Sequence, residues 1–373
     1  MAKRYDYLIV GCGFSGIVLA ERLASTGKRV LIIDERNHIG GNCYDYKAKE
    51  ILVQKYGPHI FHTKNEKVFR YLNRFTKFNN YKHKVLAYYD KKYFPIPINL
   101  DTVNKFFNIN LKDEEELKQF LEKKREKIKK ISNSEEVVVS KFGRELYEAF
   151  VEAYTKKQWD KYPYELDKSV LERLPIRYNK NDFYFDDKFQ GMPVEGYTKM
   201  FQKMLSNKNI SVKINTSYRE NLRKLAKTLI WTGKIDRYFH YELGRLEYRC
   251  AKFIFEKYKL KDFLPNSVVN FTENKFKFLR ITEFKKFYRK KSRKTLICRE
   301  FFTWEGEPSH PTINKRNIKL SKEYEKMAKK EKDVYFLGRL GKFKYINMDQ
   351  CVEEALELFE KLKKEDSKSN FLP

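Results

Sequence analysis

Two short apolar runs near the N-terminus flank a segment of helical periodicity. Residues 5–10 (YDYLIV) and 28–34 (KRVLIID) have the length and apolar character of strands buried on both faces of a parallel sheet. Between them, residues 16–26 (GIVLAERLAST) place apolar side chains at helical spacing, and Gly27 is positioned as the C-cap. The pattern therefore predicts one βαβ unit in the first forty residues.

Residues from about 100 to 165 have a different, helical pattern. Residues 113–131 predict an amphipathic helix, and Ser132 with Glu135 has capping-box spacing for a second helix. Apolar residues recur at every fourth position of that second helix: Val138, Phe142, Leu146, Phe150 and Tyr154. Such a stripe, taken alone, predicts a face packed in a core.

Short strand-like runs dominate from about residue 177 to 305. They include residues 268–273 (VVNFTE), 276–284 (FKFLRITEF) and 295–304 (TLICREFFTW), whose alternation predicts an antiparallel sheet. Residues 334–364 then predict a strand, a loop and a long helix. Asn347 and Gln350 are placed to cap the start of that helix.

Composition favours a globular protein with a large core, because 41% of the residues are hydrophobic and 16% are aromatic. No run of about twenty apolar residues predicts a membrane span. Glycines interrupt the apolar start of the chain, so no signal peptide is expected.

The five scattered cysteines contain no CxxC pair, which predicts neither a disulfide framework nor a zinc site. A cytoplasmic location is the simplest expectation.

The net charge of +29 has two interpretations. One is binding to a polyanion such as nucleic acid or anionic lipid. The other is a lysine-rich solvated surface that also attracts an anionic substrate. Basic residues occur along the whole chain, many beside carboxylates, and no basic tail, RRM signature or zinc finger is present. This distribution favours the solvated surface, and no nucleic-acid partner is expected.

Gly11, Gly13 and Gly16 form a GxGxxG motif between the first strand and its helix. The glycines permit a tight turn, a close approach of backbone to a pyrophosphate, and close packing of helix on strand. Asp34 ends the second strand, where a carboxylate can accept hydrogen bonds from a ribose. A glycine turn without ligand is the alternative, but the strand–helix context favours a dinucleotide site.

The motif alone leaves NAD and FAD open as cofactors. Residues 36–42 (RNHIGGN) follow the second strand, and the adjacent Gly40 and Gly41 allow the backbone to pass close to a ligand. This segment resembles the second phosphate-contacting segment of FAD-binding oxidoreductase-type folds. Residues 338–340 (GRL) fit the C-terminal flavin segment of those folds, and the final helix would begin at the flavin. FAD is therefore the predicted cofactor.

Seven further motifs occur together, and they resemble bacterial UDP-galactopyranose mutases from about residue 5 to 360. The motifs are YGPHIFHT (56–63), YTKKQW (154–159), RLPIR (173–177), FYFDDKFQGMPVEGYTKM (183–200), WTGKIDRYF (231–239), GRLEYR (244–249) and GRLGKFKYINMDQ (338–350). The resemblance implies an α/β fold: an FAD-binding Rossmann-like domain with an inserted helical domain and a twisted antiparallel β-sheet domain. It also implies a homodimer.

The resemblance further implies how the chain is divided among these units. The FAD-binding domain would be discontinuous, with residues 1–80, about 190–245 and 325–373. The helical domain would span about 100–165, followed by a mobile lid to about 180. The sheet domain would contain about 81–98, 177–190 and 246–324.

The family reaction interconverts the pyranose and furanose forms of a UDP-sugar, most simply UDP-galactose, with no net redox change. It uses a covalent adduct at N5 of reduced FAD and supplies furanose sugar for cell-surface polysaccharide. The reductant would be NAD(P)H or a cellular flavin reductase.

The resemblance assigns roles to individual residues. Arg173 and Arg280 would clamp the pyrophosphate, and His59 would lie beside the flavin, as the catalytic residues. The implied substrate-binding residues are Phe150, Tyr154, Thr155, Trp159, Tyr184, Asn270, Tyr345, His310 and Asn347. The implied cofactor-binding residues are Gly11, Gly13, Phe14, Ser15, Gly16, Asp34, Arg36, Gly40, Gly41, Asn42, His59, Gly338, Arg339 and Met348.

These assignments compete with simpler interpretations. An isolated arginine in so basic a chain is more often at the surface, and Phe150 and Tyr154 also belong to the core stripe. The HxxH pattern of His59 and His62 lacks the spacing and third ligand of a metal site. It favours a buried, hydrogen-bonded pair of histidines, and no metal is predicted.

Several positions depart from the family pattern. His310 stands where a tyrosine is usual, Asn347 where an aspartate is common, and His83 where an asparagine is usual. Glu195 replaces a glycine, and residues 283–287 (EFKKF) lack the usual histidines. The sugar is therefore left open, with UDP-N-acetylgalactosamine or a deoxy-sugar nucleotide as alternatives. An amine-oxidase-like flavin oxidoreductase, and a nucleic-acid-binding protein without catalysis, are hypotheses from other classes.

Overall fold

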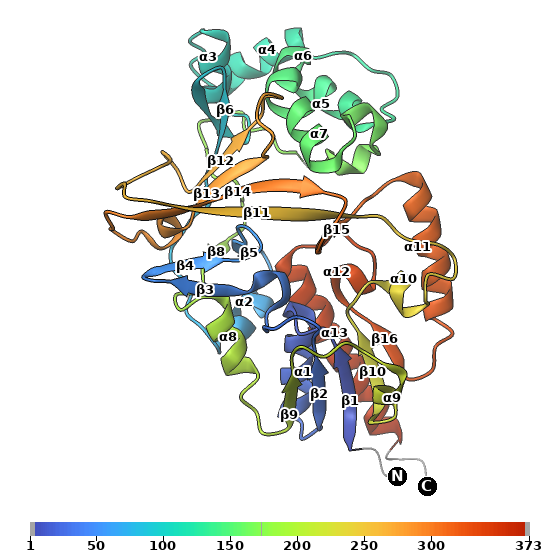
Figure 1. Cartoon of the computed structure of the whole chain (residues 1–373). Helices are drawn as coiled ribbons and strands as arrows, with labels where there is room; N and C mark the ends of the chain where they lie inside the picture. The colour runs from blue at the N-terminus through green and yellow to red at the C-terminus, as the bar shows by residue number, and fades with distance from the viewer. Residues whose placement is uncertain (1–3, 173, 370–373) are drawn as a thin grey trace.

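The computed structural model describes residues 4–172 and 174–369, with the side chains of 368 and 369 excepted. Three tiers are visible in Figure 1. A parallel sheet with its helices forms the bottom, a long mixed sheet crosses the middle, and a helical unit lies at the top. Within the described residues, no helix is both long and apolar enough to cross a membrane.

The five-stranded parallel sheet is assembled from segments far apart in the chain. Its strands, in spatial order, are β16 (Val334–Phe336), β10 (Ala226–Trp231), β1 (Tyr5–Val10), β2 (Val30–Ile33) and β9 (Ile210–Lys213). On one face α1 (Phe14–Ser25) packs against α13 (Met348–Ser369) within the main core. The predicted βαβ unit and final helix are thus present, and the Asn347 N–H donates to Gln350 Oε1 (2.8 Å) at the start of that helix.

The seven-stranded sheet carries strands from both halves of the chain. Its order is β15 (Pro308–Pro311), β11 (Tyr248–Tyr258), β14 (Thr295–Thr303), β13 (Arg280–Glu283), β12 (Val268–Phe271), β6 (Val85–Tyr89) and β7 (Lys92–Ile96). Every neighbouring pair is antiparallel except β6 with β12, which is parallel. The strands between residues 248 and 311 pair antiparallel as predicted, and β6, from an earlier segment of the chain, adds one parallel pair.

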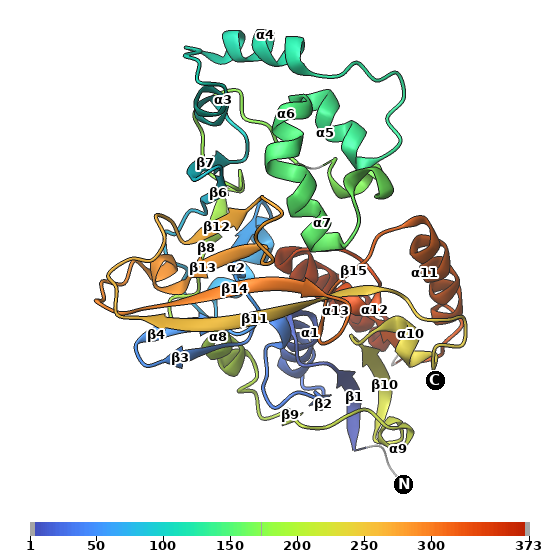
Figure 2. The ribbon, with the colours of Figure 1, turned by 45° about the horizontal axis from the view of Figure 1, so that its top comes forward.

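The helical unit at the top of Figure 2 differs from the sequence pattern in three places. The first predicted helix ends early, at Lys124, where the backbone of Arg125 turns extended (φ −69°, ψ 147°). The second begins at Ser134 with Asn133 as its cap, and Glu136, rather than Glu135, accepts from the N–H and hydroxyl of Ser132. Gly143 then interrupts the helix with φ +87°.

The apolar stripe is nevertheless buried as predicted, over a broken helix. The elements of the unit are α3 (Leu100–Phe107), α4 (Glu114–Lys124), α5 (Ser134–Phe142), α6 (Arg144–Tyr147), a π-helical turn (Glu148–Glu152) and α7 (Ala153–Trp159). Val138, Phe142, Leu146 and Phe150 share one core. That core places Tyr154, one turn later, at the edge of the unit that faces the sheet.

Smaller elements connect these units. They are β3 (Asp45–Ala48), β4 (Ile51–Gln54), β5 (Phe61–Thr63), β8 (Phe189–Gly191), α2 (Glu66–Asn73), α8 (Tyr197–Met204), α9 (Glu220–Arg223), α10 (Ile235–Tyr238), α11 (Lys315–Ala328) and α12 (Gly338–Gly341). The 3₁₀ turns are Gly41–Cys43, Pro163–Glu165, Lys168–Val170 and Phe284–Tyr288. β3 pairs with β4, and β5 with β8, each antiparallel.

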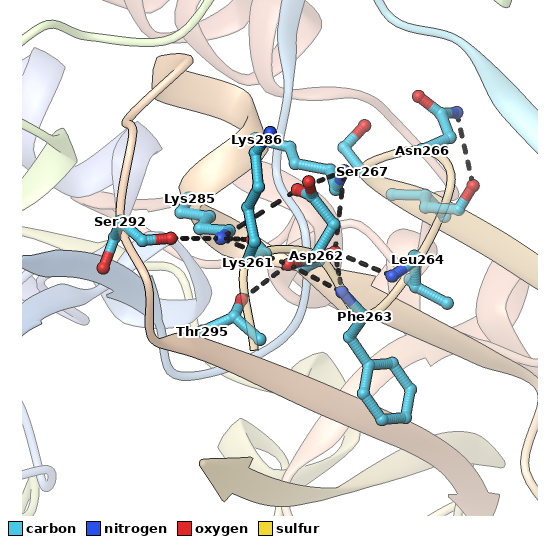
Figure 3. Close-up of polar contacts among 12 residues, drawn as sticks. Lys261, Asp262, Phe263, Leu264, Asn266, Ser267, Lys285, Lys286, Ser292 and Thr295 are labelled. Carbon is cyan, nitrogen blue, oxygen red and sulfur yellow. Dashed lines mark hydrogen bonds and ion pairs between the residues drawn. The ribbon is translucent and has the colours of Figure 1, made fainter. Parts of the chain in front are cut away.

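A buried polar knot joins two loops of the middle sheet (Figure 3). The Lys285 ammonium lies 3.8 Å from the Glu283 carboxylate and donates to the carbonyls of Lys261 and Ser292. Glu283 in turn accepts from the Thr295 hydroxyl (2.6 Å) and from backbone N–H groups of the 261–264 segment. Both charged side chains are almost fully buried, so each requires its partners.

We expect Lys285→Met to lower the free energy of unfolding by roughly 3 kcal/mol, because it removes the cation beside a buried carboxylate and frees two carbonyls. Lys291→Met, on an exposed position of the neighbouring loop, is the matched control and should change it by less than about 0.5 kcal/mol. Urea unfolding of the full chain measures both. Equal effects would contradict a stabilising role for the knot.

Candidate functional site

One cavity lies at the carboxyl ends of β1 and β10, where α1 begins. All fourteen residues predicted to bind the cofactor line it, and they come from five separate stretches of the chain. The two glycine segments meet backbone to backbone: the Gly40 N–H donates to the Cys12 carbonyl (2.7 Å), and a Cβ on Gly41 would lie 3.0 Å from Gly13 Cα. A Cβ on Gly16 would lie 2.2 Å from the Gly11 carbonyl oxygen. Side chains are thus excluded where a pyrophosphate would approach α1.

Asp34 faces this cavity but also organises its backbone. Oδ2 accepts from the Cys12 N–H (2.7 Å) and Oδ1 from the Arg36 N–H (2.9 Å). Each carboxylate oxygen retains a lone pair for a further donor, such as a ribose hydroxyl. The Arg36 guanidinium pairs with Glu307 (2.7 Å) and lies over the Tyr56 ring. The acceptors of the Asp34 carboxylate therefore fit the hydroxyls of an adenosine ribose without a 2′-phosphate.

Arg339 closes the opposite end of the cavity. Its Nη1 donates to the Ser309 carbonyl (3.0 Å), and Nε and Nη2 donate to the Ile346 carbonyl (3.1 and 2.6 Å). These bonds join the β15 segment to the loop before α13, and Met348 begins that helix at the cavity wall. The cation and the helix N-terminus together provide a positive end for a bound cofactor.

His59 lies on the cavity wall as a neutral imidazole. Nδ1 is 3.0 Å from the Gly57 carbonyl, which can only accept, so Nδ1 carries the proton and Nε2 is a free acceptor. Burial, with a contribution from the charges of Arg339 and Arg280, lowers the pKa of His59 to about 4, although the Gly57 hydrogen bond opposes this shift. His59 is thus within electrostatic range of both arginines, one at the cavity and one on the sheet.

The second histidine of the HxxH pattern has a different partner. His62 Nδ1 is 2.9 Å from the Asp187 carboxylate, and the ring stacks on Phe185. Both histidines are hydrogen-bonded, as predicted, but not to one another. In the part of the chain that the structure describes, no group of three His, Cys, Asp or Glu side chains could hold a metal ion.

A polar row crosses the middle sheet beside this cavity. Asn270 pairs with Arg280, and Arg280 with Glu300, on the adjacent strands β12, β13 and β14, so the three side chains share one face. Arg280 Nη2 donates to Glu300 Oε1 (3.0 Å), and Nε lies 2.8 Å from Oε2. Burial alone would lower the pKa of Arg280, but the Glu300 carboxylate raises it, so the guanidinium stays charged.

The row leaves polar atoms for a ligand. Arg280 Nη1 makes no hydrogen bond with the described residues, and the buried Oδ1 of Asn270 has no donor among them. Tyr154, on α7, lies within electrostatic range of Arg280, Tyr184 and Tyr345, and burial raises its pKa. A charged donor, an amide acceptor and phenol groups are therefore gathered at one place.

Lys157 fixes α7 over this row. Its ammonium donates to the carbonyls of Phe271 (2.5 Å) and Glu273 (3.1 Å) in the turn that follows β12. Burial lowers the pKa of Lys157 to about 8. The same helix carries Tyr154, Thr155 and Trp159, so this anchor sets their position relative to Arg280.

Aromatic rings surround His310, which is buried. The ring centroid of His310 lies 4.9 Å from that of Trp159, 5.2 Å from Tyr345 and 5.3 Å from Phe302. Thr155 is buried nearby on α7. Phe150, in contrast, is enclosed by Phe94 and Phe106 inside the helical unit, in keeping with the core interpretation. Arg173 lies outside the described residues.

His83 contacts Tyr184 through its backbone and its ring. Its Nδ1 is 3.0 Å from the Tyr81 hydroxyl, its carbonyl accepts from the Tyr184 N–H (2.8 Å), and its ring meets the Tyr184 ring edge-on. Burial, with smaller contributions from Arg280 and His62, lowers the pKa of His83 to about 3. His83 is therefore a neutral packing residue, although the sequence placed it among the departures that leave the sugar open.

The sequence analysis assigned no role to several residues at the site, although three of them lie in the quoted motif WTGKIDRYF (231–239). Thr232 and Gly233 line the cavity directly after β10, and Arg237 and Ser309 line it as well. The rule that ligands bind at the carboxyl ends of parallel strands would have indicated the first two. Glu300 could not have been found in this way, because its pairing with Arg280 depends on strand register.

Comparison with known proteins identifies relatives over nearly the whole chain. The sequence model described as UDP-galactopyranose mutase matches residues 149–345, and an NAD(P)-binding Rossmann-like domain matches residues 9–75. A probable UDP-galactopyranose mutase of Klebsiella pneumoniae is 38% identical, over 94% of this chain and 93% of that protein. A dTDP-fucopyranose mutase of Escherichia coli is 36% identical, over 94% and 96%.

A further curated relative and a solved structure agree with these matches. A UDP-galactopyranose mutase of Mycoplasma genitalium is 33% identical, over 93% of this chain and 92% of that protein. A crystal structure of reduced UDP-galactopyranose mutase superposes with a TM-score of 0.76 at 15% identity, over 96% of both chains. That superposition shows a shared fold.

The lowered pKa of His83 predicts a pH dependence of stability. Below its ordinary value of 6.5 the unfolded chain binds a proton that the folded chain excludes until about pH 3. The free energy of unfolding should therefore fall by about 1.4 kcal/mol per pH unit from this group as pH drops below 6.5. We expect His83→Asn to flatten the slope by that amount in urea unfolding between pH 6 and pH 4.5.

The control is His240→Asn, at an exposed turn, which should keep the original slope. If His83→Asn unfolds with the same pH dependence as the parent chain, His83 is not held neutral by burial.

Proposed function

We propose a function from the family, because the chain belongs to the UDP-galactopyranose mutases, which are flavin-dependent isomerases. The proposed reaction interconverts the pyranose and furanose forms of a nucleotide-linked sugar. UDP-galactose is the proposed substrate, because the matching family model and two of the relatives are described as acting on that sugar. The homodimer implied by the sequence resemblance belongs to the same proposal.

One observation carries the proposal: the Gly57 carbonyl holds His59 on the wall of the cofactor cavity, and a Cβ on Gly57 would lie 3.3 Å from the Glu300 carboxylate that pairs with Arg280. The cradle for a dinucleotide and the cluster for an anion are therefore adjacent. A reaction that takes a sugar from a diphosphate onto a cofactor requires this adjacency. An oxidase that acts on a small neutral substrate has no anionic group for a buried guanidinium beside the cofactor to bind.

The cavity fits FAD by its donors and by its excluded volume. The N-terminus of α1 would face the pyrophosphate, Asp34 the adenosine ribose, and Arg339 with the start of α13 the flavin end. Reduced FAD, if bound there, would supply an electron-rich nitrogen as the nucleophile toward the anomeric carbon of the sugar.

The remaining duties fall to side chains of this chain. Arg280 would stabilise the negative charge that gathers on the departing UDP, with Glu300 holding the guanidinium in one orientation. Tyr154, Tyr184 and Tyr345 would donate phenol hydrogens to the phosphates. Asn270 Oδ1 would accept from a sugar hydroxyl. We assign to Arg173, from the sequence resemblance, the second guanidinium of the clamp.

A deoxy-sugar on thymidine diphosphate is the second candidate substrate. The Escherichia coli relative described as a dTDP-fucopyranose mutase is nearly as similar as the first listed UDP-galactopyranose mutase. His310 and Asn347, two positions that differ from the family pattern, lie toward the sugar and phosphate in this proposal.

The direct test mixes the dithionite-reduced, flavin-loaded protein with UDP-galactose or dTDP-fucose under anaerobic conditions. We expect a furanose product from one of them, identified by chromatography and NMR, with the flavin still reduced at the end. Stoichiometric flavin reoxidation would indicate an oxidoreductase instead. No product from either sugar nucleotide would contradict the proposal.

Arg280→Lys should lower kcat/KM for the accepted sugar nucleotide by roughly 10²–10³, because an ammonium cannot form the planar, bidentate contacts of a guanidinium. Flavin content should be unchanged. Arg299→Lys is the matched control, because Arg299 precedes Glu300 on β14 and points to the opposite face, where it pairs with Glu256. Unchanged kcat/KM in Arg280→Lys would remove Arg280 from the phosphate site.

A further inference from the structure

Three loops meet at the end of the molecule that lies on the left in Figures 1 and 2, where β3 and β11 end and β4 and β14 begin. They contain residues 47–50, 257–262 and 289–294. Two contacts join them: the Lys290 ammonium donates to the Glu50 carbonyl (2.9 Å), and the buried Lys285 bridges the carbonyls of Lys261 and Ser292. We call these three loops the cationic end.

The exposed charges of the cationic end are strongly unbalanced. Its exposed carboxylates are Glu50 and Asp262. Its exposed cations are Lys47, Lys49, Lys257, Lys259, Lys261, Arg289, Lys290, Lys291, Arg293 and Lys294. Across residues 4–172 and 174–369, the ion pairs within 4.0 Å include Lys290 with Glu50 and none of the other nine cations. The cationic end is therefore a region of concentrated positive potential.

This arrangement differs from the lysine-rich surface elsewhere. On the helical unit, several exposed cations pair with carboxylates, as in Lys118 with Glu114 and Lys124 with Glu145. At the cationic end, Lys285 donates to the carbonyls of Lys261 and Ser292 (Figure 3), so two of the loops that carry unpaired cations are joined by a buried side chain.

An apolar side chain lies among these cations. Leu260 is 47% exposed and stands between Lys259 and Lys261 at the turn of the β11–β12 loop. Cations that contact lipid phosphates, together with an apolar residue that enters the interface, are the combination by which peripheral proteins bind anionic membranes. Tyr258, within this end, and Tyr288, which directly precedes it, are only partly exposed, so they offer little ring surface on which nucleic-acid bases could stack.

We propose that the cationic end docks the enzyme on an anionic phospholipid surface. None of its residues lines the cofactor cavity or belongs to the polar row of Asn270, Arg280 and Glu300. Docking therefore leaves the site open to a soluble nucleotide sugar. The proposal is independent of which sugar the enzyme accepts.

The test is co-sedimentation of the flavin-loaded full chain with vesicles of phosphatidylcholine containing a minority of phosphatidylglycerol, at physiological ionic strength. The triple variant Lys291→Glu, Arg293→Glu, Lys294→Glu should bind roughly 100-fold more weakly, since each cation near an anionic membrane contributes about fivefold. The matched control Lys319→Glu, Lys322→Glu, Lys329→Glu changes the net charge equally at exposed positions of α11 and of the residue after it. It should retain most of the binding.

A second variant separates lipid from other polyanions. Leu260→Ser should weaken vesicle binding several-fold and leave binding to single-stranded RNA unchanged, because only a lipid surface accepts the apolar side chain. Three results would overturn the proposal: no sedimentation of the parent chain with anionic vesicles, equal losses in both triple variants, or RNA binding that exceeds vesicle binding and is lost in the same variant. Isomerase activity on the soluble substrate should be equal in all forms.

Discussion

A buried positive charge on the middle sheet is the constraint on which the site depends. The guanidinium of Arg280 is removed from most of its water, and only a fixed carboxylate makes that position tolerable. Strand register supplies Glu300 on one side and Asn270 on the other, so the cation is oriented before any ligand arrives. Lys157 then places α7 and its aromatic residues over the same face. A preorganised donor of this kind requires no rearrangement when charge develops on a phosphate.

The two sheets divide the chemistry between them. The parallel sheet provides a backbone cradle in which glycines, a helix N-terminus and Asp34 are suited to a dinucleotide. The middle sheet provides the charged row suited to the substrate's phosphates. His59 connects the two, and burial beside two arginines keeps it uncharged, so it can accept a hydrogen bond there without adding to the positive potential.

The parts predicted from sequence were those determined by local pattern. The first βαβ unit, the glycine cradle and the capped final helix follow from neighbouring residues, and the fourteen residues that the family resemblance assigned to the cofactor line one cavity. Three features depend instead on contacts between distant parts of the folded chain. They are the early helix end at Lys124, the helix break at Gly143 and the parallel pairing of β6. Glu300 and the cationic end were missed for the same reason, because register and loop contacts bring distant residues together. The domain boundaries and the role of Arg173 stay predictions.

The central claim is that Arg280 grips the diphosphate beside the cofactor. The most direct measurement is a crystal structure of the flavin-loaded protein with bound UDP. The account predicts a phosphate oxygen about 2.7–3.2 Å from Arg280 Nη1, with the Glu300 contact retained. A diphosphate bound elsewhere, with the Nη1 of Arg280 still facing no ligand, would contradict it.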